Sequence, residues 1–234
     1  MHKSLLFLAA MAMTSPAMAA TNLVTNGGFE SGNTGFTSTY TYVTPLAVPG
    51  AGNNMVPENT YTVGTNAFNQ HPSWASIGAF SGANYLIANG SSTNDAAVWA
   101  QTIVGLVVGN TYNFSAWATN VCCNSTYGGT NVSPLIISVG SGGTPTTIAS
   151  SGVLGVTGTW TQFIGSFVAT STSTNLAIFT DVNAASGNDF GLDEISVTAA
   201  VPEPATWLMM MLGMAGVGFS LRRKKQSMPR VRFA

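Results

Sequence analysis

Basic residues are nearly absent from most of this 234-residue chain. All seven Lys and Arg lie at position 3 or from position 222 onward, so residues 20–200 carry no permanent positive charge. Nucleic-acid binding requires Lys and Arg to displace the counterions of the phosphates. We therefore predict no nucleic-acid partner, and binding of this segment to an acidic polymer or an anionic lipid is disfavoured.

Histidine is equally scarce. His71 is the only histidine between residues 20 and 200, and we predict an ordinary surface residue there with no catalytic role. Asp189, Asp193 and Glu194 form a carboxylate cluster that could suggest a glycosidase pair. Asp193 and Glu194 are sequence neighbours, however, and neighbours on a strand point to opposite faces. The sequence therefore predicts a protein that is not an enzyme.

Only two cysteines occur, Cys122 and Cys123, and they are adjacent. Neighbouring Cα atoms are about 3.8 Å apart across a trans peptide, which is below the usual span of a disulfide, so a bond between them is strained. The alternatives are a strained vicinal ring, two free thiols or bridges between chains. We favour a vicinal ring at the rim of a loop over residues 120–130. One adjacent pair lacks the spacing of a zinc site.

Patterns that favour helix are rare between the two ends of the chain. Short β-branched and aromatic runs are separated there by turn-forming clusters of Gly, Asn, Ser and Pro. This spacing predicts an all-β sandwich or barrel, built as one domain over residues 20–200. The segment Val43–Gly64 is predicted to be a long loop. The expected strands are Phe36–Val43, Tyr85–Ala88, Val98–Val104, Thr111–Thr119, Leu135–Val139, Trp160–Val168, Leu176–Thr180 and Ile195–Val197.

The N-terminus indicates export. Lys3 supplies a positive charge, Leu5–Met13 a short apolar run, and Ala17-Met18-Ala19 a cleavage site of small residues. Together these features predict a signal peptide over residues 1–19, with cleavage after Ala19.

The C-terminus carries a Pro-Glu-Pro turn, an apolar stretch over 205–221 and a basic cluster, in that order. The stretch is close to the lower limit of about 17 residues for a membrane span, so we expect a transmembrane helix there. The basic cluster would stop transfer, and a basic cytoplasmic tail would follow over 226–234. The turn is Pro202, Glu203 and Pro204, and the cluster is Arg222, Arg223, Lys224 and Lys225.

These three parts resemble a PEP-CTERM sorting signal over residues 201–225, the substrate of the membrane transpeptidase exosortase. The resemblance implies exosortase as a partner, transient anchoring in the membrane, cleavage near Pro202–Pro204, and delivery to the cell surface or extracellular matrix. If the tail is not cut, it is a permanent anchor instead.

Two motifs stand at opposite ends of the predicted sandwich. The opening motif is Asn26-Gly27-Gly28-Phe29-Glu30, and the closing motif runs from Gly187 to Val197. Together they resemble galactose-binding-like jelly rolls, in particular the carbohydrate-binding modules of families 4 and 9. The resemblance implies a single jelly-roll β-sandwich whose first and last strands lie side by side. It also implies a structural calcium ion held by Glu30 and Asp193.

Strand parity gives a separate reason to expect a metal at Asp193. If Ile195 and Val197 face the core, Asp193 shares that face, where a carboxylate is costly unless it is paired or metal-bound. No Lys or Arg between residues 20 and 200 can pair with it, and calcium takes several oxygen ligands. The alternative is a strand end in solvent with ordinary hydrated acids.

Aromatic residues divide into two groups. Trp99, Trp117 and Trp160 lie in predicted strands, where we expect core positions. Trp74 and Tyr127 lie near loops, where an exposed ring could stack on the apolar face of a sugar, and ordinary loop packing is the alternative.

These features predict a non-enzymatic, exported bacterial protein of the cell surface or biofilm matrix, associated with exopolysaccharide. A structural or adhesive surface protein without a sugar site is the alternative. A glycan-active enzyme is the third.

Overall fold

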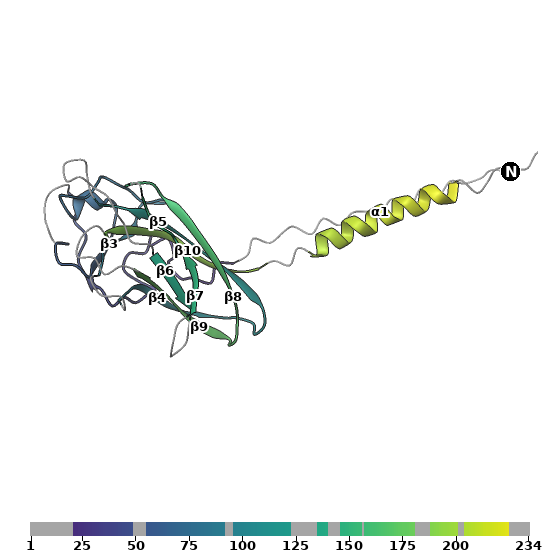
Figure 1. The fold of residues 1–234 in the computed structure, drawn as a ribbon, viewed down its shortest axis with the longest axis horizontal. Coiled ribbons are helices and arrows are strands. Elements are labelled where there is room, and N and C mark those ends of the chain that lie inside the picture. The colour runs from purple at the N-terminus through teal and green to yellow at the C-terminus, as the bar shows by residue number, and fades with distance from the viewer. Residues whose placement is uncertain are drawn as a thin grey trace, which may run out of the picture.

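The described residues form two β-sheets, an α-helix and a short 3-10 helix (Figure 1). The computed structural model describes residues 21–48, 55–91, 96–122, 135–139, 146–155, 157–180, 188–200 and 204–224. The predicted signal peptide, residues 1–19, lies outside these ranges.

The larger sheet has six strands in the order β1-β2-β3-β10-β5-β8, and the smaller has four in the order β4-β9-β6-β7. All pairs are antiparallel except β1 with β2. The all-β prediction is confirmed. The strands are β1 (Thr41–Tyr42), β2 (Thr60–Gly64), β3 (Tyr85–Asn89), β4 (Ala97–Val104), β5 (Thr111–Asn120), β6 (Leu135–Val139), β7 (Thr146–Ser150), β8 (Thr161–Val168), β9 (Ser173–Thr180) and β10 (Phe190–Ala199).

The main core lies between the two sheets. On β5 it takes alternate residues, Tyr112, Phe114, Ala116 and Ala118, because successive side chains of a strand point to opposite faces. The smaller sheet contributes Trp99, which confirms its predicted core position. The residues between those of the β5 core, including Trp117, therefore belong to the outer face of the six-stranded sheet.

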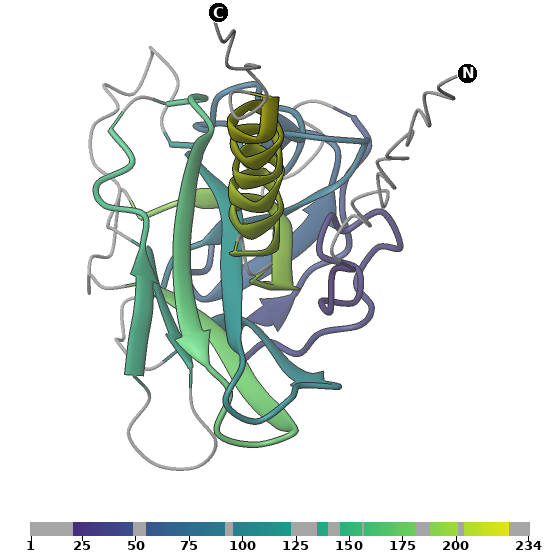
Figure 2. The same ribbon diagram turned by 90° about the vertical axis from the view of Figure 1, so that its right-hand side faces the viewer.

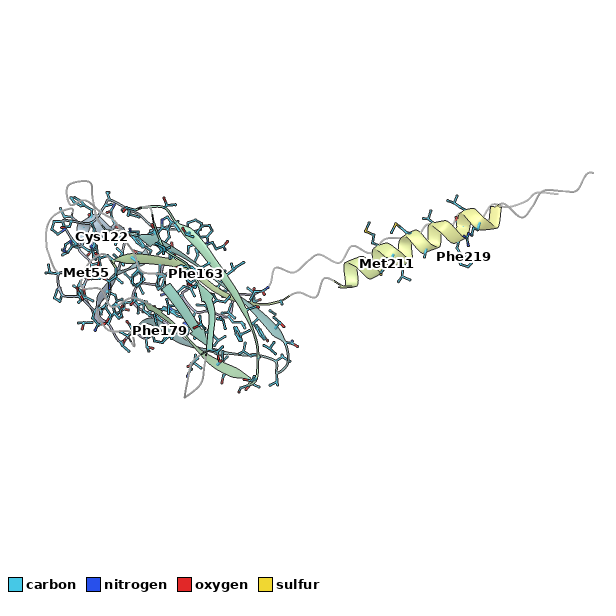
Figure 3. All side chains as sticks on the ribbon, in the orientation of Figure 1. Met55, Cys122, Phe163, Phe179, Met211 and Phe219 are labelled. Carbon is cyan, nitrogen blue, oxygen red and sulfur yellow. The ribbon has the colours of Figure 1, made fainter. Side chains whose placement is uncertain are left out.

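A second, smaller core covers part of that outer face. Tyr85 and Ile87 of β3 belong to it, whereas Leu86 and Ala88 belong to the main core, so β3 is buried on both faces. Figure 3 shows two further members, Met55 and Cys122, at the end of the sandwich away from the helix.

The N-terminal segment runs along the part of β10 that β3 leaves unpaired. Leu23 donates its backbone N–H to the carbonyl of Val197, and Ile195 donates to the carbonyl of Gly27. The Asn22 side chain accepts from the Val197 N–H and donates to the Ile195 carbonyl. The opening and closing motifs therefore lie side by side, as the jelly-roll resemblance implies.

The prediction of a long loop over Val43–Gly64 is wrong in part, because β2 occupies Thr60–Gly64. Every residue of β2 is buried, because β1 and β3 pair with both of its edges and its Tyr61 and Val63 pack in the main core. The Pro, Gly and Asn residues that precede β2 favour turns. The pairing that makes this segment a strand is with β3, which is distant in the sequence. β7 also lacks a predicted counterpart.

A short 3-10 helix, η1 (Ala67–Asn69), follows β2. The α-helix of the described residues, α1 (Pro204–Lys224), occupies the predicted place in the tail. In Figure 3, Met211 and Phe219 project from it, and both side chains are exposed. Within the described part of the chain, no helix is both long and apolar enough to cross a membrane. The expected transmembrane helix over 205–221 is therefore not found.

Candidate functional site

A group of aromatic rings lies on the outer face of the six-stranded sheet. Trp117 projects from this face because its neighbours Ala116 and Ala118 lie in the main core. The ring of Phe80 stacks on Trp117, with centroids 3.9 Å apart and planes 15° from parallel. Phe80 also meets the edge of Trp160 at 6.0 Å. We call Phe80, Trp117 and Trp160 the aromatic platform.

The platform is partly open to solvent. Phe80 is 40% exposed, and Trp117 and Trp160 are half-buried. The buried ring of Tyr85 packs edge-on against Trp160, with the ring centroids 5.5 Å apart. Neither Trp117 nor Trp160 is fully buried. The predicted core position is wrong for Trp117, which lies on the outer face, and it holds only in part for Trp160, which packs against the second core.

Uncharged polar side chains continue this face along β5 and β8. Trp117 lies opposite Gln162 in the register, and Asn113 lies opposite Ser166. Gln162, Asn113 and Ser166 are exposed. Aromatic rings bordered by a few polar groups are typical of small-molecule and sugar sites, because the rings supply contact area and the polar groups orient the ligand.

The loop that carries Phe80 is held by two carboxylates. Asp193 accepts hydrogen bonds from the backbone N–H groups of Phe80, at 2.9 Å, and Ser81, at 3.1 Å. Glu30 accepts from Ala83, at 2.8 Å, and Asn84, at 2.9 Å. Glu30 and Asp193 were selected from the sequence as partners in one site, and the structure brings both to the same loop.

A β-bulge explains why Asp193 faces this loop. The register of β10 against β5 shifts between Asp193 and Ser196, and Glu194 adopts a positive φ of 49°. Leu192 and Ile195 therefore both enter the main core, and Asp193 lies on the opposite face, beside Trp117. The parity prediction, which put Asp193 on the core face, is wrong.

The bulge also overturns the prediction that Asp193 and Glu194 point apart. A Cβ placed on Gly28 would lie 3.1 Å from a carboxylate oxygen of Glu194 and 3.9 Å from one of Asp193. Both acids therefore approach the same point. Burial raises the pKa of Asp193 to about 6.

Backbone N–H groups already face three carboxylate oxygens of the predicted calcium pair, Glu30 and Asp193. Oδ2 of Asp193 accepts from Phe80 and Ser81, and its Oδ1 accepts from the Glu194 N–H at 2.8 Å. Calcium takes six to eight oxygen ligands, whereas backbone N–H groups face these oxygens. Among the described residues, no group of three or more His, Cys, Asp or Glu could hold a metal. The calcium prediction has no support in these contacts.

Trp74 does not present its ring to solvent. It is 1% exposed, and its indole N–H donates to Oδ2 of Asp189 at 3.0 Å. His71 stacks on it with centroids 5.1 Å apart, and burial lowers the pKa of His71. The prediction of Trp74 as a stacking residue for sugar is wrong, and the alternative of loop packing holds.

Asp189 should make stability depend on pH. Burial raises its pKa from 3.8 to about 6. Between these values the folded state binds a proton that the unfolded state releases, so the free energy of unfolding falls as the pH rises from about 4 to 6. Asp189→Asn removes this effect and still accepts the Trp74 hydrogen bond. From pH 4 to pH 8, we therefore expect the free energy of unfolding of Asp189→Asn to rise relative to that of the wild type by on the order of 2–3 kcal/mol.

Melting curves of the wild type and Asp189→Asn at pH 4 and pH 8 test this expectation. His71 and Asp193 are present in both proteins, so their titration cancels in the comparison. An equal response of the two proteins to pH would show that Asp189 does not titrate as its burial implies.

Two other predicted groups lie partly outside the description. Cys122 is disulfide-bonded, as the vicinal ring requires, and the chain has one other cysteine, Cys123. Cys123 and Tyr127 lie outside the described residues, so the prediction of Tyr127 as a stacking residue stays a prediction.

The sorting motif is placed in part. Pro204 is the first residue of α1, and Arg222, Arg223 and Lys224 lie in its last turn. Pro202, Glu203 and Lys225 lie outside the described residues. The helix therefore runs from the last residue of the motif into the basic cluster, in the order read from the sequence.

Comparisons with known proteins give separate information on the tail and on the sandwich. Residues 200–224 match the family model of the PEP-CTERM protein-sorting motif, which confirms the predicted signal. This motif marks proteins that are exported and sorted to the cell surface or extracellular matrix, and it implies exosortase as a partner. No curated protein matches the chain.

Similar solved structures concern the sandwich. A Stig cyclase from Fischerella sp. TAU is 15% identical, with a TM-score of 0.53, over 79% of this chain and all of that one. A family 16 carbohydrate-binding module is 19% identical, with a TM-score of 0.40, over 76% of this chain and 99% of that one. A CBM4 structure is 16% identical, with a TM-score of 0.40 and the same two shares. At these identities the similarity concerns the fold alone.

Proposed function

We propose that this protein is a non-enzymatic surface or matrix protein whose β-sandwich binds an uncharged polysaccharide on the aromatic platform. The platform carries the proposal. Its rings are flat, partly exposed and fixed by stacking, and the apolar face of a sugar ring can pack against such a surface at little cost in side-chain entropy. Gln162, Asn113 and Ser166 can donate to and accept from sugar hydroxyls.

The charge of the sandwich favours a neutral ligand. Residues 20–200 contain seven Asp and Glu and no Lys or Arg. Two of these carboxylates, Glu30 and Asp193, bind the loop that carries Phe80. An acidic polysaccharide would meet like charges beside the platform and would find no cation to pair with.

The sorting motif supports the proposed place of action. Exosortase would cut near Pro202–Pro204 and release the sandwich to the cell surface or extracellular matrix. Association with exopolysaccharide, and with a biofilm matrix in particular, is part of this proposal.

A panel of polysaccharides tests the selectivity. We expect residues 20–200 to be retarded in gels that contain a neutral polymer, such as xylan or mixed-linkage β-glucan, and to migrate freely through gels that contain alginate or polygalacturonate. Bovine serum albumin serves as the non-binding control. Retardation by the acidic polymers alone would contradict the proposal, and no retardation by any polymer would favour a structural or adhesive protein without a sugar site.

A further inference from the structure

An exposed apolar surface lies at one end of the sandwich. The connection between β4 and β5 presents Val107 and Val108, and the flanking strand ends present Val104 of β4 and Val168 of β8. Each of the four side chains is more than half exposed. We call Val104, Val107, Val108 and Val168 the valine tip.

Backbone hydrogen bonds fix the shape of the valine tip. Leu106 donates to the carbonyl of Thr172, Gly109 donates to Ala169, and Ala169 donates to Asn110. Leu106 is buried, so it anchors the connection while the valines remain outside. Residues 104–111 and 168–173 include no charged side chain. A partner can therefore cover this surface without removing any charge from water.

Ala200, the last described residue before the Pro-Glu-Pro motif, is bonded to the strand that follows the valine tip. Ala200 donates its N–H to the carbonyl of Thr111 at 2.9 Å, and Thr111 is the first residue of β5. Only residues 201–203 separate Ala200 from Pro204. Because an extended chain advances at most about 3.3–3.6 Å per residue, the Cα of Pro204 lies within about 14 Å of that of Ala200. In Figure 1 α1 lies to one side of the sandwich, and Figure 2 views the molecule from that side.

An enzyme that holds Pro202–Pro204 in its active site must therefore approach this end of the sandwich. We propose that the valine tip is a docking surface for exosortase, which it contacts while the motif is cut. This inference rests on the proposed sorting by exosortase. The tip would add an apolar contact close to the motif, and it would hold the scissile segment at a fixed distance from the enzyme.

The test uses the full-length chain in a host that processes it. We expect Val107→Ser/Val108→Ser to slow removal of the tail about tenfold, measured by pulse-chase and by the intact mass of the product. Val153→Ser is the matched control, because Val153 is 70% exposed but lies outside the valine tip, and it should be processed like the wild type. Both variants should keep the wild-type melting temperature, and Val104→Thr, which preserves shape, should give a smaller effect in the same direction.

Three outcomes would count against docking. Equal processing of Val107→Ser/Val108→Ser and the wild type would overturn it while leaving sorting intact. A wild-type chain that retains its tail would refute sorting itself, and docking with it. The third concerns lipid. If the substitutions weaken binding of the full-length chain to phosphatidylcholine vesicles without exosortase as strongly as they slow processing, the tip serves the membrane and not the enzyme.

Discussion

Replacing Phe80 by Ala should weaken binding of residues 20–200 to their neutral polysaccharide by about tenfold to thirtyfold. An exposed aromatic residue at the centre of a contact commonly contributes about 2 kcal/mol, and each 1.4 kcal/mol corresponds to a factor of ten. Phe80 stacks on Trp117 at 3.9 Å and is the more exposed of the two residues, so the substitution removes the outer ring of the stacked pair. Titration calorimetry with a soluble oligosaccharide of the bound polymer measures the loss.

Tyr42→Ala is the matched control for this substitution. Tyr42 is also an aromatic residue that is 40% exposed, and it also packs against another ring, Tyr61, at 5.4 Å. It lies on β1, however, at the opposite edge of the six-stranded sheet from β8. We expect its removal to leave binding unchanged. An equal loss in both variants, or in neither, would place the ligand away from the platform.

Asp193→Ala should be strongly destabilising. It removes the acceptor of three backbone N–H groups, those of Phe80, Ser81 and Glu194. Leaving buried donors unsatisfied costs about 1–3 kcal/mol for each group that water does not reach. With a total on the order of 3 kcal/mol, the melting temperature should fall by roughly 6–12 °C. Thermal melts of residues 20–200 measure it.

The same melts decide the question of calcium. We expect a chelator to leave the wild-type melting temperature unchanged, because the carboxylate oxygens already accept backbone hydrogen bonds. Glu194→Ala serves as the neighbouring acid control and should cost far less than Asp193→Ala. A chelator-induced fall that Asp193→Ala abolishes would contradict the metal-free account and restore the predicted site, since a metal that binds only the folded state stabilises it.

Local patterns predicted the sandwich because they arise from the physics of single strands. Thr111–Thr119 alternates between core and outer residues, and the β5 that forms there, Thr111–Asn120, does the same. β2 has no such local pattern, because it pairs with β3 and buries Tyr61 and Val63 in the main core. Nothing in Thr60–Gly64 alone distinguishes it from the turn-forming residues that precede it.

The β-bulge was detectable in principle. In an unbroken strand, Phe190 and Leu192 would point to one face of the sheet, and Ile195 and Val197 would point to the other. Both pairs can be buried in the same core only if one extra residue is inserted between them, as in a β-bulge. Reading parity backwards from Ile195 and Val197 alone assumed an unbroken strand and therefore placed Asp193 on the core face. The argument from parity for a metal at Asp193 therefore does not hold, and the calcium prediction rests on the family resemblance alone.

The platform could be predicted only in part. The sequence predicts core positions for Trp117 and Trp160, because an aromatic residue in a strand is more often in the core. It does not reveal which part of the sheet a covering loop leaves exposed to solvent. Phe80 lies between the apolar run Ile77–Ala79 and the turn Ser81-Gly82, and it becomes part of the site only because Asp193 draws its loop over β5. Such a contact, 113 positions apart in the sequence, has no local signal.

The indole N–H resonances of residues 20–200 test the central claim most directly. The segment contains four tryptophans, of which Trp117 and Trp160 are half-buried in the platform and Trp74 and Trp99 are buried elsewhere. On titration with an oligosaccharide of the polymer that binds, we predict that the signals of Trp117 and Trp160 shift in proportion to occupancy and that those of Trp74 and Trp99 do not. A saturating ligand that leaves Trp117 and Trp160 unmoved would contradict the account.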